Sequence, residues 1–375
     1  MNNSILKELK FKNEKALEYQ HGSPERLELK AQLQQMKDSV LDIPIIIDGK
    51  EIRTENKEKC IVPHDNKKIL AYYHLAGEKE IKMAIESTLK AKSAWENLHW
   101  EHRVSIFLKA AELASGPWRA KLNAATMLSQ SKTYKQAEID SACELIDFLR
   151  YNAACLYQIY SEQPISTNIY RNRMEYRPLE GFIFAVSPFN FTAIASNLVA
   201  APAVAGNTIL WKPASTSVYS SYVVYQLFKE AGLPNGVINF IPCRSADIGD
   251  TILTHEDLSG LHFTGSTEVF QKMWQTIGNN IHKYKTFPRL VGETGGKNYI
   301  FAHSSAHIEP LATGLIEGAF EYQGQKCSAV SRAYIPKSLW PKLKETLLEK
   351  ASHITNKMGD VENRSTFIGA VIDDK

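Results

Sequence analysis

GFIFAVS, at residues 181–187, is the first of four short apolar runs separated by helical segments; the others are NTILWK (207–212), GVINFI (236–241) and GLHFTG (260–265). The runs begin at intervals of roughly 25 residues, the size of a unit of strand, crossover helix and strand. Apolar runs of this length that alternate with helices are typical of strands buried on both faces of a parallel sheet. The stretch therefore predicts an α/β domain.

Helical patterns flank this region. Upstream, apolar residues spaced for one helix face predict packing helices over 80–118 and 137–160. The first 40 residues are polar and helix-prone, which predicts an N-terminal arm on the surface. Downstream, the sequence predicts a second series of strands at 298–302 and 331–336 and helices at 312–322 and 339–351.

Composition narrows the possible partners. The chain has 375 residues, 44% of them hydrophobic and 23% charged, which is enough for large cores and two domains. The net charge of +3 is small and its basic residues are spread along the chain, so neither nucleic acid nor a membrane is an expected partner. Five cysteines without a CxxC pair argue against a disulfide framework and a structural zinc site, and no metal is predicted.

Polar residues follow the predicted strands at the sheet edge where α/β proteins bind ligands. The Asn190 amide can stabilise an oxyanion, although a lone Asn there is more often a helix cap or an Asx turn. Lys212 can hydrogen-bond a ribose, or be an ordinary solvated lysine. Gly265, followed by Ser266 and Thr267, suits a pyrophosphate or an ordinary helix N-cap. No GxGxxG motif is present, so these residues alone are a weak dinucleotide signal.

Two further segments carry groups for covalent catalysis. GETGGKN (292–298) places Glu293 beside a glycine pair, and QGQKCSA (323–329) places Cys327 after its own glycine. A thiolate is a strong nucleophile towards carbonyl carbon, and a carboxylate within reach can activate water to release an acyl group. Taken singly, Cys327 is more often a buried inert cysteine and Glu293 a solvated carboxylate.

These segments together, in this order and at this spacing, resemble the aldehyde dehydrogenase superfamily over roughly residues 20–375. The motifs that carry the resemblance are SPFNF (187–191), WKPA (211–214), FTGST (263–267), GETGGKN and QGQKCSA. Within the superfamily the sequence most resembles the delta-1-pyrroline-5-carboxylate dehydrogenases. The details that indicate this subfamily are GSPER (22–26), SPFNF, FPRLVGETGGKN (287–298) and EYQGQKCSA (321–329).

The resemblance implies a role for each matching residue. Cys327 matches the nucleophile, Glu293 the proton acceptor and Asn190 the residue that stabilises the transition state. The matches to NAD contacts are Ser187, Lys212, Gly265, Ser266, Thr267, Glu268 and Val269. The matches to substrate contacts are Lys326, Ser328, Glu144 and Phe191.

The implied fold is α/β and aldehyde dehydrogenase-like. It has an N-terminal arm over 1–40, a parallel-sheet, Rossmann-like NAD-binding domain over 41–290 with part of an oligomerisation flap near 163–179, and an incomplete α/β catalytic domain over 291–375. The implied reaction is NAD-dependent oxidation of L-glutamate gamma-semialdehyde, from delta-1-pyrroline-5-carboxylate, to L-glutamate. This is the second step of proline degradation, and it proceeds through a thiohemiacetal and a thioester on the cysteine.

The resemblance also implies a small aldehyde substrate, a homodimer and the mitochondrial matrix. The N-terminus has lysines but also glutamates, which is a weak presequence and leaves the cytoplasm as the alternative. The superfamily continues beyond FIGAVIDDK (367–375), so we expect a fragment that lacks the remainder of the catalytic domain and has doubtful activity alone. Two alternatives stay open: a non-catalytic nucleotide-binding or subunit-interaction module, and a dehydrogenase for a different aldehyde.

Overall fold

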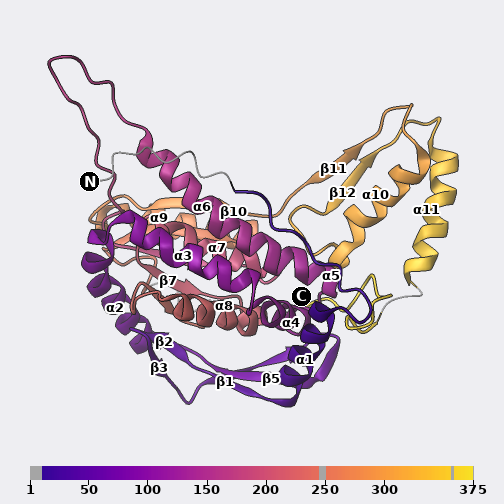
Figure 1. The fold of residues 1–375 in the computed structure, drawn as a ribbon, viewed down its shortest axis with the longest axis horizontal. Helices are drawn as coiled ribbons and strands as arrows, with labels where there is room; N and C mark the ends of the chain where they lie inside the picture. Colours follow the sequence, from indigo (N-terminus) through magenta and orange to yellow (C-terminus); the bar gives the residue numbers. More distant parts are fainter. Residues whose placement is uncertain (1–10, 245–250, 356–358, 375) are drawn as a thin grey trace.

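The computed structural model describes residues 11–244, 251–355 and 359–374. A large twisted sheet with helices on both faces forms most of the molecule, and a smaller unit of two strands and two helices projects from it (Figure 1). No helix in these ranges is long and apolar enough to cross a membrane.

Seven strands form the large sheet, and its five central and edge strands from β10 to β8 are parallel. Their order across the sheet is β10 (Arg289–Glu293), β9 (Leu258–Thr264), β6 (Phe182–Val186), β7 (Ile209–Lys212), β8 (Ile238–Phe240), β2 (Ile45–Ile47) and β3 (Lys50–Ile52). The four predicted strands, β6 to β9, are confirmed. The antiparallel pair β2 and β3 and the parallel edge strand β10 were not predicted.

The order of these strands reverses beside β6. The chain runs from β6 to β7 and β8 on one side, then crosses back to place β9 on the other side of β6. Connections leave the carboxyl ends of β6 and β9 in opposite directions, which opens a crevice above that edge. The fold therefore fixes where a ligand site can form before any side chain is considered.

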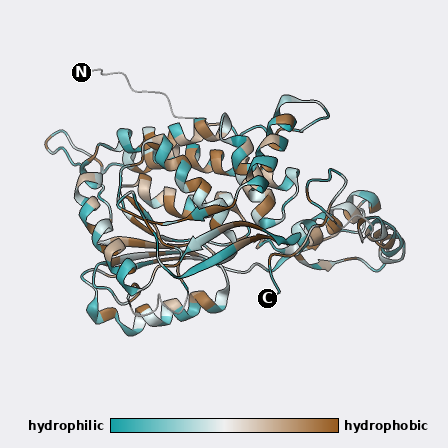
Figure 2. Cartoon of the chain, turned by 90° about the horizontal axis from the view of Figure 1, so that it is seen from below, coloured by the Kyte–Doolittle hydropathy of each residue, from teal (hydrophilic) through white to brown (hydrophobic). Residues whose placement is uncertain are grey.

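The side chains of β6 alternate between two cores because successive residues of a strand point to opposite faces. Ile183 and Ala185 belong to one core, and Phe182, Phe184 and Val186 to the other. The first core is covered by α3 (Trp100–Ser115), α4 (Arg119–Gln130), α6 (Glu144–Ser161), α7 (Thr192–Val204) and α8 (Val218–Ala231). The second is covered by α2 (Glu78–Asn97) and α9 (Thr267–Asn279), so the sheet is the middle layer of three (Figure 2).

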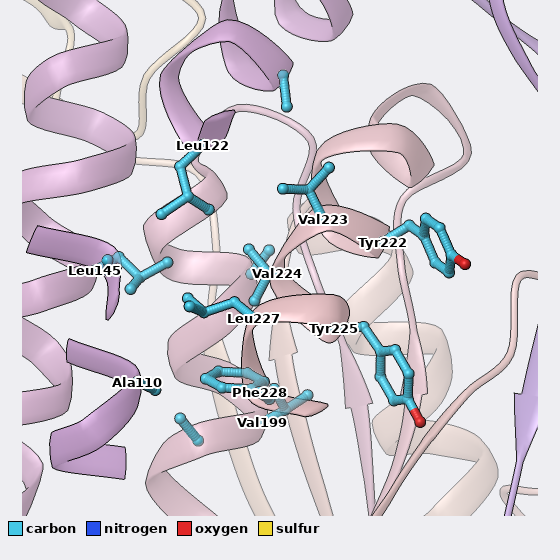
Figure 3. Close-up of a cluster of buried hydrophobic side chains, with 14 of the residues drawn as sticks. Ala110, Leu122, Leu145, Val199, Tyr222, Val223, Val224, Tyr225, Leu227 and Phe228 are labelled. Atoms are coloured by element: carbon cyan, nitrogen blue, oxygen red, sulfur yellow. The ribbon is translucent and has the colours of Figure 1, made fainter. Parts of the chain in front are cut away.

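Helix α8 lies at the centre of the first core. Leu227 and Phe228 are fully buried and point towards the helices on one side, where Leu122 and Leu145 lie (Figure 3). Burying a side chain of this size contributes about 1.5–3 kcal/mol of stability. The helix ends at Gly232, which adopts the left-handed φ of 100° that its C-terminal cap requires.

The predicted helices upstream of the sheet are confirmed as α2, α3 and α6. Two features were not predicted: α4, and a π-helical segment, η1 (Glu138–Cys143), which runs from α5 (Tyr134–Ala137) directly into α6. A π-helical turn adds a residue to the helical ladder and is frequent at functional sites. It has no simple periodicity by which the sequence could reveal it.

The N-terminal arm lies on the surface and packs against the body through one apolar face. Helix α1 (Pro24–Asp38) buries Leu29, Leu33 and Met36 against α4 and the small sheet of β1 (Leu41–Ile43), β5 (Asp65–His74) and β4 (Lys57–Val62). Before it, the Glu14 carboxylate pairs with Arg119 at 2.8 Å. The arm is therefore packed against the body, and residues 1–10 lie outside the described residues.

The projecting unit confirms the second predicted series. Strands β11 (Asn298–Phe301) and β12 (Val330–Tyr334) pair in parallel, and α10 (Ile308–Phe320) packs on α11 (Trp340–Thr355) around a small core. Large apolar side chains remain exposed on its strands, with Tyr299 63% and Phe301 76% accessible. The segment 162–179 extends from the body as a loop with Ile165 87% exposed (Figure 1). Its role in oligomerisation stays a prediction.

Candidate active site

A cavity of about 620 Å³ opens at the carboxyl ends of β6, β7 and β9. Its wall is shared between the large sheet and the loop that precedes β12 in the projecting unit. Asn190, Glu293 and Cys327 all line it, although they come from three separate segments. The crevice created by the strand order thus collects the three residues for which the sequence implied chemistry.

Cys327 is half-buried in the loop between α10 and β12. The chain reaches it through three consecutive residues in left-handed conformations: Tyr322 (φ 49°), Gln323 (φ 57°) and Gly324 (φ 71°). Such φ angles are uncommon for non-glycine residues and occur where surrounding contacts enforce them. One such contact is the buried Tyr322 hydroxyl, which donates a hydrogen bond of 2.7 Å to the Gln130 carbonyl.

The main chain of Cys327 is also held from the other side of the cavity. The Asn298 amide donates a hydrogen bond of 2.5 Å to the Cys327 carbonyl oxygen. A Cβ at Gly296 would overlap that same carbonyl, so only glycine permits this approach. The thiol is therefore presented by a backbone that is fixed on both sides.

Asn190 faces residues 321–329, which carry the predicted nucleophile Cys327 and are called the nucleophile loop below. Its side-chain amide donates a hydrogen bond of 2.8 Å to the Gln325 carbonyl, two residues before Cys327. Helix α7 begins after Phe191, and no side-chain cap is formed at its start. The helix-cap alternative for Asn190 is therefore not what the structure contains, and Asn190 lines the same cavity as Cys327.

Glu293 is the last residue of β10, and its side chain is exposed at the cavity. Its backbone carbonyl accepts a hydrogen bond of 3.1 Å from the Gly265 N–H, which joins the ends of β10 and β9. The sheet thereby fixes the position of the Glu293 backbone at the mouth of the cavity that its side chain lines.

Lys212 is buried, with 6% of its surface exposed, so the alternative of a solvated surface lysine is wrong. Among the described residues, its ammonium group makes one long hydrogen bond of 3.4 Å to the Pro213 carbonyl. Burial lowers the pKa of this lysine. A buried ammonium group with one long hydrogen bond has donors left for the hydroxyl groups of a ribose. Ser187 lies beside it, buried, and accepts a hydrogen bond of 3.0 Å from the Trp211 indole.

The stretch 265–269 lies only partly in the cavity. Gly265, Ser266 and Val269 line it, whereas Thr267 and Glu268 are exposed outside it, and Glu268 pairs with Lys272 at 2.8 Å. Ser266 is the N-cap of α9, which was the alternative considered for it from the sequence. Its hydroxyl accepts a hydrogen bond of 3.3 Å from the Val269 N–H. Helix N-termini attract phosphate, so the cap and a pyrophosphate contact are compatible.

The four predicted substrate residues differ in where they lie relative to the cavity. Lys326 lines the cavity, and its ammonium group lies 5.4 Å from the centre of the buried Phe191 ring. Glu144 belongs to the same charged neighbourhood, since its pKa responds to Lys326. Ser328 is exposed and does not line the cavity. The structure therefore places Phe191 and Glu144 near Lys326, although neither of them lines the cavity.

Glu144 offers a test of this neighbourhood by pH. Burial and then the Asp140 carboxylate raise its pKa from 4.5 to about 7, against the opposing effect of Lys132 and Lys326. The folded state holds this proton more tightly than the unfolded chain does. Its stabilising effect is therefore fully present below about pH 4.5 and is lost as pH rises through about 7.

We expect Glu144→Gln, which is neutral at every pH, to melt at a higher Tm than the parent chain at about pH 8 and at nearly the same Tm at about pH 5. Thermal melts of both proteins across this range would measure the difference. A Tm difference that stays constant with pH would show that Glu144 is not held in its neutral form.

Sequence reasoning missed four residues that shape the site. Asn298 and Gln325 position the nucleophile loop through the hydrogen bonds described above. Lys132 and Asp140 form a buried ion pair of 2.6 Å behind the cavity. Asn298 belongs to the GETGGKN motif, so its role could have been predicted from the sequence. Lys132 follows the end of a helix, and its sequence context does not distinguish it from a surface lysine.

Comparison with known proteins decides the family. Residues 51–375 match the aldehyde dehydrogenase family. The chain belongs to this family. It is 46% identical over 364 residues to a mitochondrial delta-1-pyrroline-5-carboxylate dehydrogenase from Dictyostelium discoideum, and 45% identical over 368 residues to the one from Mus musculus.

Solved structures agree. The chain superposes with a TM-score of 0.96 and 45% identity on the Delta-pyrroline-5-carboxylate dehydrogenase from Mycobacterium tuberculosis, which was solved with NAD bound. The match covers 100% of this aldehyde dehydrogenase chain and 70% of that one. The two curated relatives are matched over 96% and 98% of this chain, which spans 65% of the length of each.

Proposed function

We propose that this aldehyde dehydrogenase chain serves in the NAD-dependent oxidation of L-glutamate gamma-semialdehyde to L-glutamate. One observation carries the proposal: a single cavity gathers the Cys327 thiol, the Asn190 amide, the Glu293 carboxylate and the buried Lys212 ammonium group. The substrate is inferred from the delta-1-pyrroline-5-carboxylate dehydrogenases to which the chain is similar.

The reaction begins with attack of the Cys327 thiolate on the aldehyde carbon. The carbonyl π electrons move to oxygen, so the product is a thiohemiacetal with an oxyanion. The Asn190 amide and the Cys327 backbone N–H act as donors to this oxygen, and one such donor is typically worth about 3 kcal/mol in the transition state. Asn190 already lies against the nucleophile loop, so little reorganisation is required of it.

Release of the acid is the task of Glu293. NAD, when bound, would supply the acceptor for the hydride of the thiohemiacetal carbon. As this C–H bond breaks, the oxyanion re-forms the carbonyl, which leaves Cys327 acylated as a thioester. The Glu293 carboxylate takes a proton from water, whose oxygen attacks the thioester carbon. The carbon to sulfur bond breaks and glutamate leaves with the thiolate restored.

The cavity suits NAD at several points. Lys212 has an under-satisfied buried ammonium group for a ribose, and Ser187 lies beside it. The N-terminus of α9 offers backbone N–H groups to a pyrophosphate, and Gly265, Ser266 and Val269 line the cavity there. Thr267 and Glu268, outside the cavity, have weaker support as cofactor contacts.

The opposite end of the cavity is assigned to the amino acid part of the substrate. Lys326 lines the cavity and offers a cation to the carboxylate. Phe191 and Glu144 lie near Lys326 without lining the cavity, so their assignment has weaker support. We assign Ser328 to the same end on the family resemblance alone. We propose a homodimer and the mitochondrial matrix on the resemblance, and the names of two relatives include the word mitochondrial.

The test is NADH formation from glutamate semialdehyde by the purified chain and by a version extended to the length of its relatives. Activity in either form that depends on Cys327 supports the proposal. Oxidation of another aldehyde in preference to glutamate semialdehyde would overturn the substrate assignment. Absence of aldehyde oxidation in both forms, with NAD still bound, would favour a nucleotide-binding module instead.

The contribution of Asn190 can be measured in the active form. We expect Asn190→Ala to lower kcat about 100-fold with a small change in KM, because its amide acts on the charge that develops in the transition state. Asn197 lies on helix α7, and its amide oxygen accepts a hydrogen bond of 2.8 Å from the Asn152 amide on helix α6, so Asn197→Ala provides a matched control. A large change in KM with kcat unchanged would assign Asn190 to substrate binding instead.

A further inference from the structure

We propose that Lys132 is a positioning residue that joins the nucleophile loop to the Asn190 loop and, through Asp140, holds Lys326 in place beside Cys327. The inference rests on the proposed function, because it explains how that site is assembled. It does not require Lys132 to touch the substrate.

Lys132 is fully buried, which is rare for a lysine. Its ammonium group lies 4.3 Å from the centre of the Phe191 ring and 4.5 Å from that of Tyr322. Both distances are within the range of a cation–π interaction. Phe191 follows Asn190 directly, and Tyr322 belongs to the loop that carries Cys327. One ammonium group therefore contacts the two segments whose separation decides the geometry of attack.

Asp140 completes the connection. Its Oδ2 atom accepts from the Lys132 ammonium group at 2.6 Å and from the Lys326 ammonium group at 2.9 Å. Two cations thus share one buried carboxylate oxygen. Lys326 is the residue next to the nucleophile, so the position of its side chain depends on Asp140, and that of Asp140 on Lys132.

Local backbone structure positions both Lys132 and Asp140. Asp140 lies within the π-helical segment η1, whose extra residue changes which side chains face the site. Lys132 follows α4 immediately after Ser131, which ends the helix in a left-handed conformation with φ of 54°. A cation there is favoured by the carbonyl end of the helix.

The charges around the cluster argue for a purpose other than stability. Burial lowers the pKa of Lys132 to about 8, with Asp140 opposing that effect. Glu144 acts on the same cluster, and Glu321 accepts from Lys326 at 3.2 Å. A buried ion pair is often no more stabilising than apolar residues of the same size. The geometry of the pair, which touches both loops, accounts better for its presence.

The test uses thiol alkylation, which requires neither NAD nor an aldehyde. Rates of reaction of Cys327 with iodoacetate and with neutral iodoacetamide are followed by mass spectrometry of its peptide, and the exposed Cys155 serves as the internal control. The ratio of the two rates reports the charge facing Cys327. The iodoacetamide rate alone reports how firmly the loop is held.

Lys132→Met keeps the length of the side chain but removes its charge. We expect the ratio of iodoacetate to iodoacetamide rates at Cys327 to fall about fivefold, since a buried cation nearby is lost. The ratio at Cys155 stays unchanged. Lys132→Arg, which keeps the charge, should restore the ratio to near that of the parent. A folded Lys132→Met protein with the parent ratio and the parent iodoacetamide rate would overturn the proposal.

The double variant Lys132→Met/Asp140→Asn covers the case in which Lys132→Met alone does not fold. It leaves no unpaired buried charge from this pair, so it is expected to fold. Its charge balance equals that of the parent, and the rate ratio should therefore stay close to the parent value. The iodoacetamide rate at Cys327 should rise severalfold because Lys326 and the loop have lost their anchor. An unchanged rate would reduce the pair to ordinary packing, even if glutamate semialdehyde proves to be the substrate.

Discussion

Cys327→Ala is expected to abolish NADH formation from glutamate semialdehyde, by about 10⁴-fold or more. Loss of a nucleophile removes the covalent route altogether, and effects of this size or larger follow when a nucleophilic side chain is deleted. Steady-state absorbance of NADH measures the loss in whichever length of the protein turns over. NAD binding, measured by calorimetry, should remain within about twofold because the thiol is not among the groups assigned to the nucleotide.

Cys155→Ala is the matched control. Cys155 is exposed on helix α6, away from the cavity, and its removal should leave activity at the level of the parent. Substantial turnover in Cys327→Ala would mean that another group attacks the aldehyde. It would also make the fixed backbone around Cys327 a feature of folding alone.

Glu293→Gln is expected to separate acylation from release. Steady-state turnover should fall by about 10²–10⁴-fold, the usual contribution of a general base. The first turnover should still produce close to one equivalent of NADH, since Glu293 acts on water after the thioester has formed. A stopped-flow trace therefore shows a burst followed by a nearly flat phase, and mass spectrometry finds the acyl group on Cys327.

A comparable exposed carboxylate controls for charge. Glu78 pairs with Lys82 on helix α2 at 2.7 Å, outside the cavity, and Glu78→Gln should leave both phases unchanged. Loss of the burst together with turnover in Glu293→Gln would contradict a role confined to hydrolysis. In that case Glu293 would be needed to deprotonate Cys327.

The parallel part of the large sheet was predictable because β6, β7, β8 and β9 are buried on both faces, so that their sequences are continuous apolar runs. Strand β10 escaped prediction because most of its residues are exposed and its sequence, RLVGE, is half polar. Strands β2 and β3 come from far upstream in the chain, and no local sequence pattern indicates that they pair with this sheet. Local periodicity reveals an element but not its distant neighbours.

The candidate site divides in the same way. Cys327, Glu293 and Asn190 stand in motifs whose order and spacing were informative, and the structure places all three around one cavity. Lys132 and Asp140 belong to no motif, and their ion pair exists only because η1 and the end of α4 meet behind the nucleophile loop. Tyr322 likewise reads as an ordinary aromatic residue, since a left-handed φ leaves no trace in composition.

The chain order of the large sheet bears on how the protein matures. All seven strands lie between residues 45 and 293, and Asn190 and Glu293 are therefore translated before Cys327. Folding during synthesis proceeds from the N-terminus, so the sheet can close while the nucleophile is still inside the ribosome. The Cys327 thiol then leaves the ribosome after the segments that carry Asn190 and Glu293, which line the same cavity. If Cys327 is the nucleophile that we propose, it is therefore synthesised only after the residues proposed to act with it.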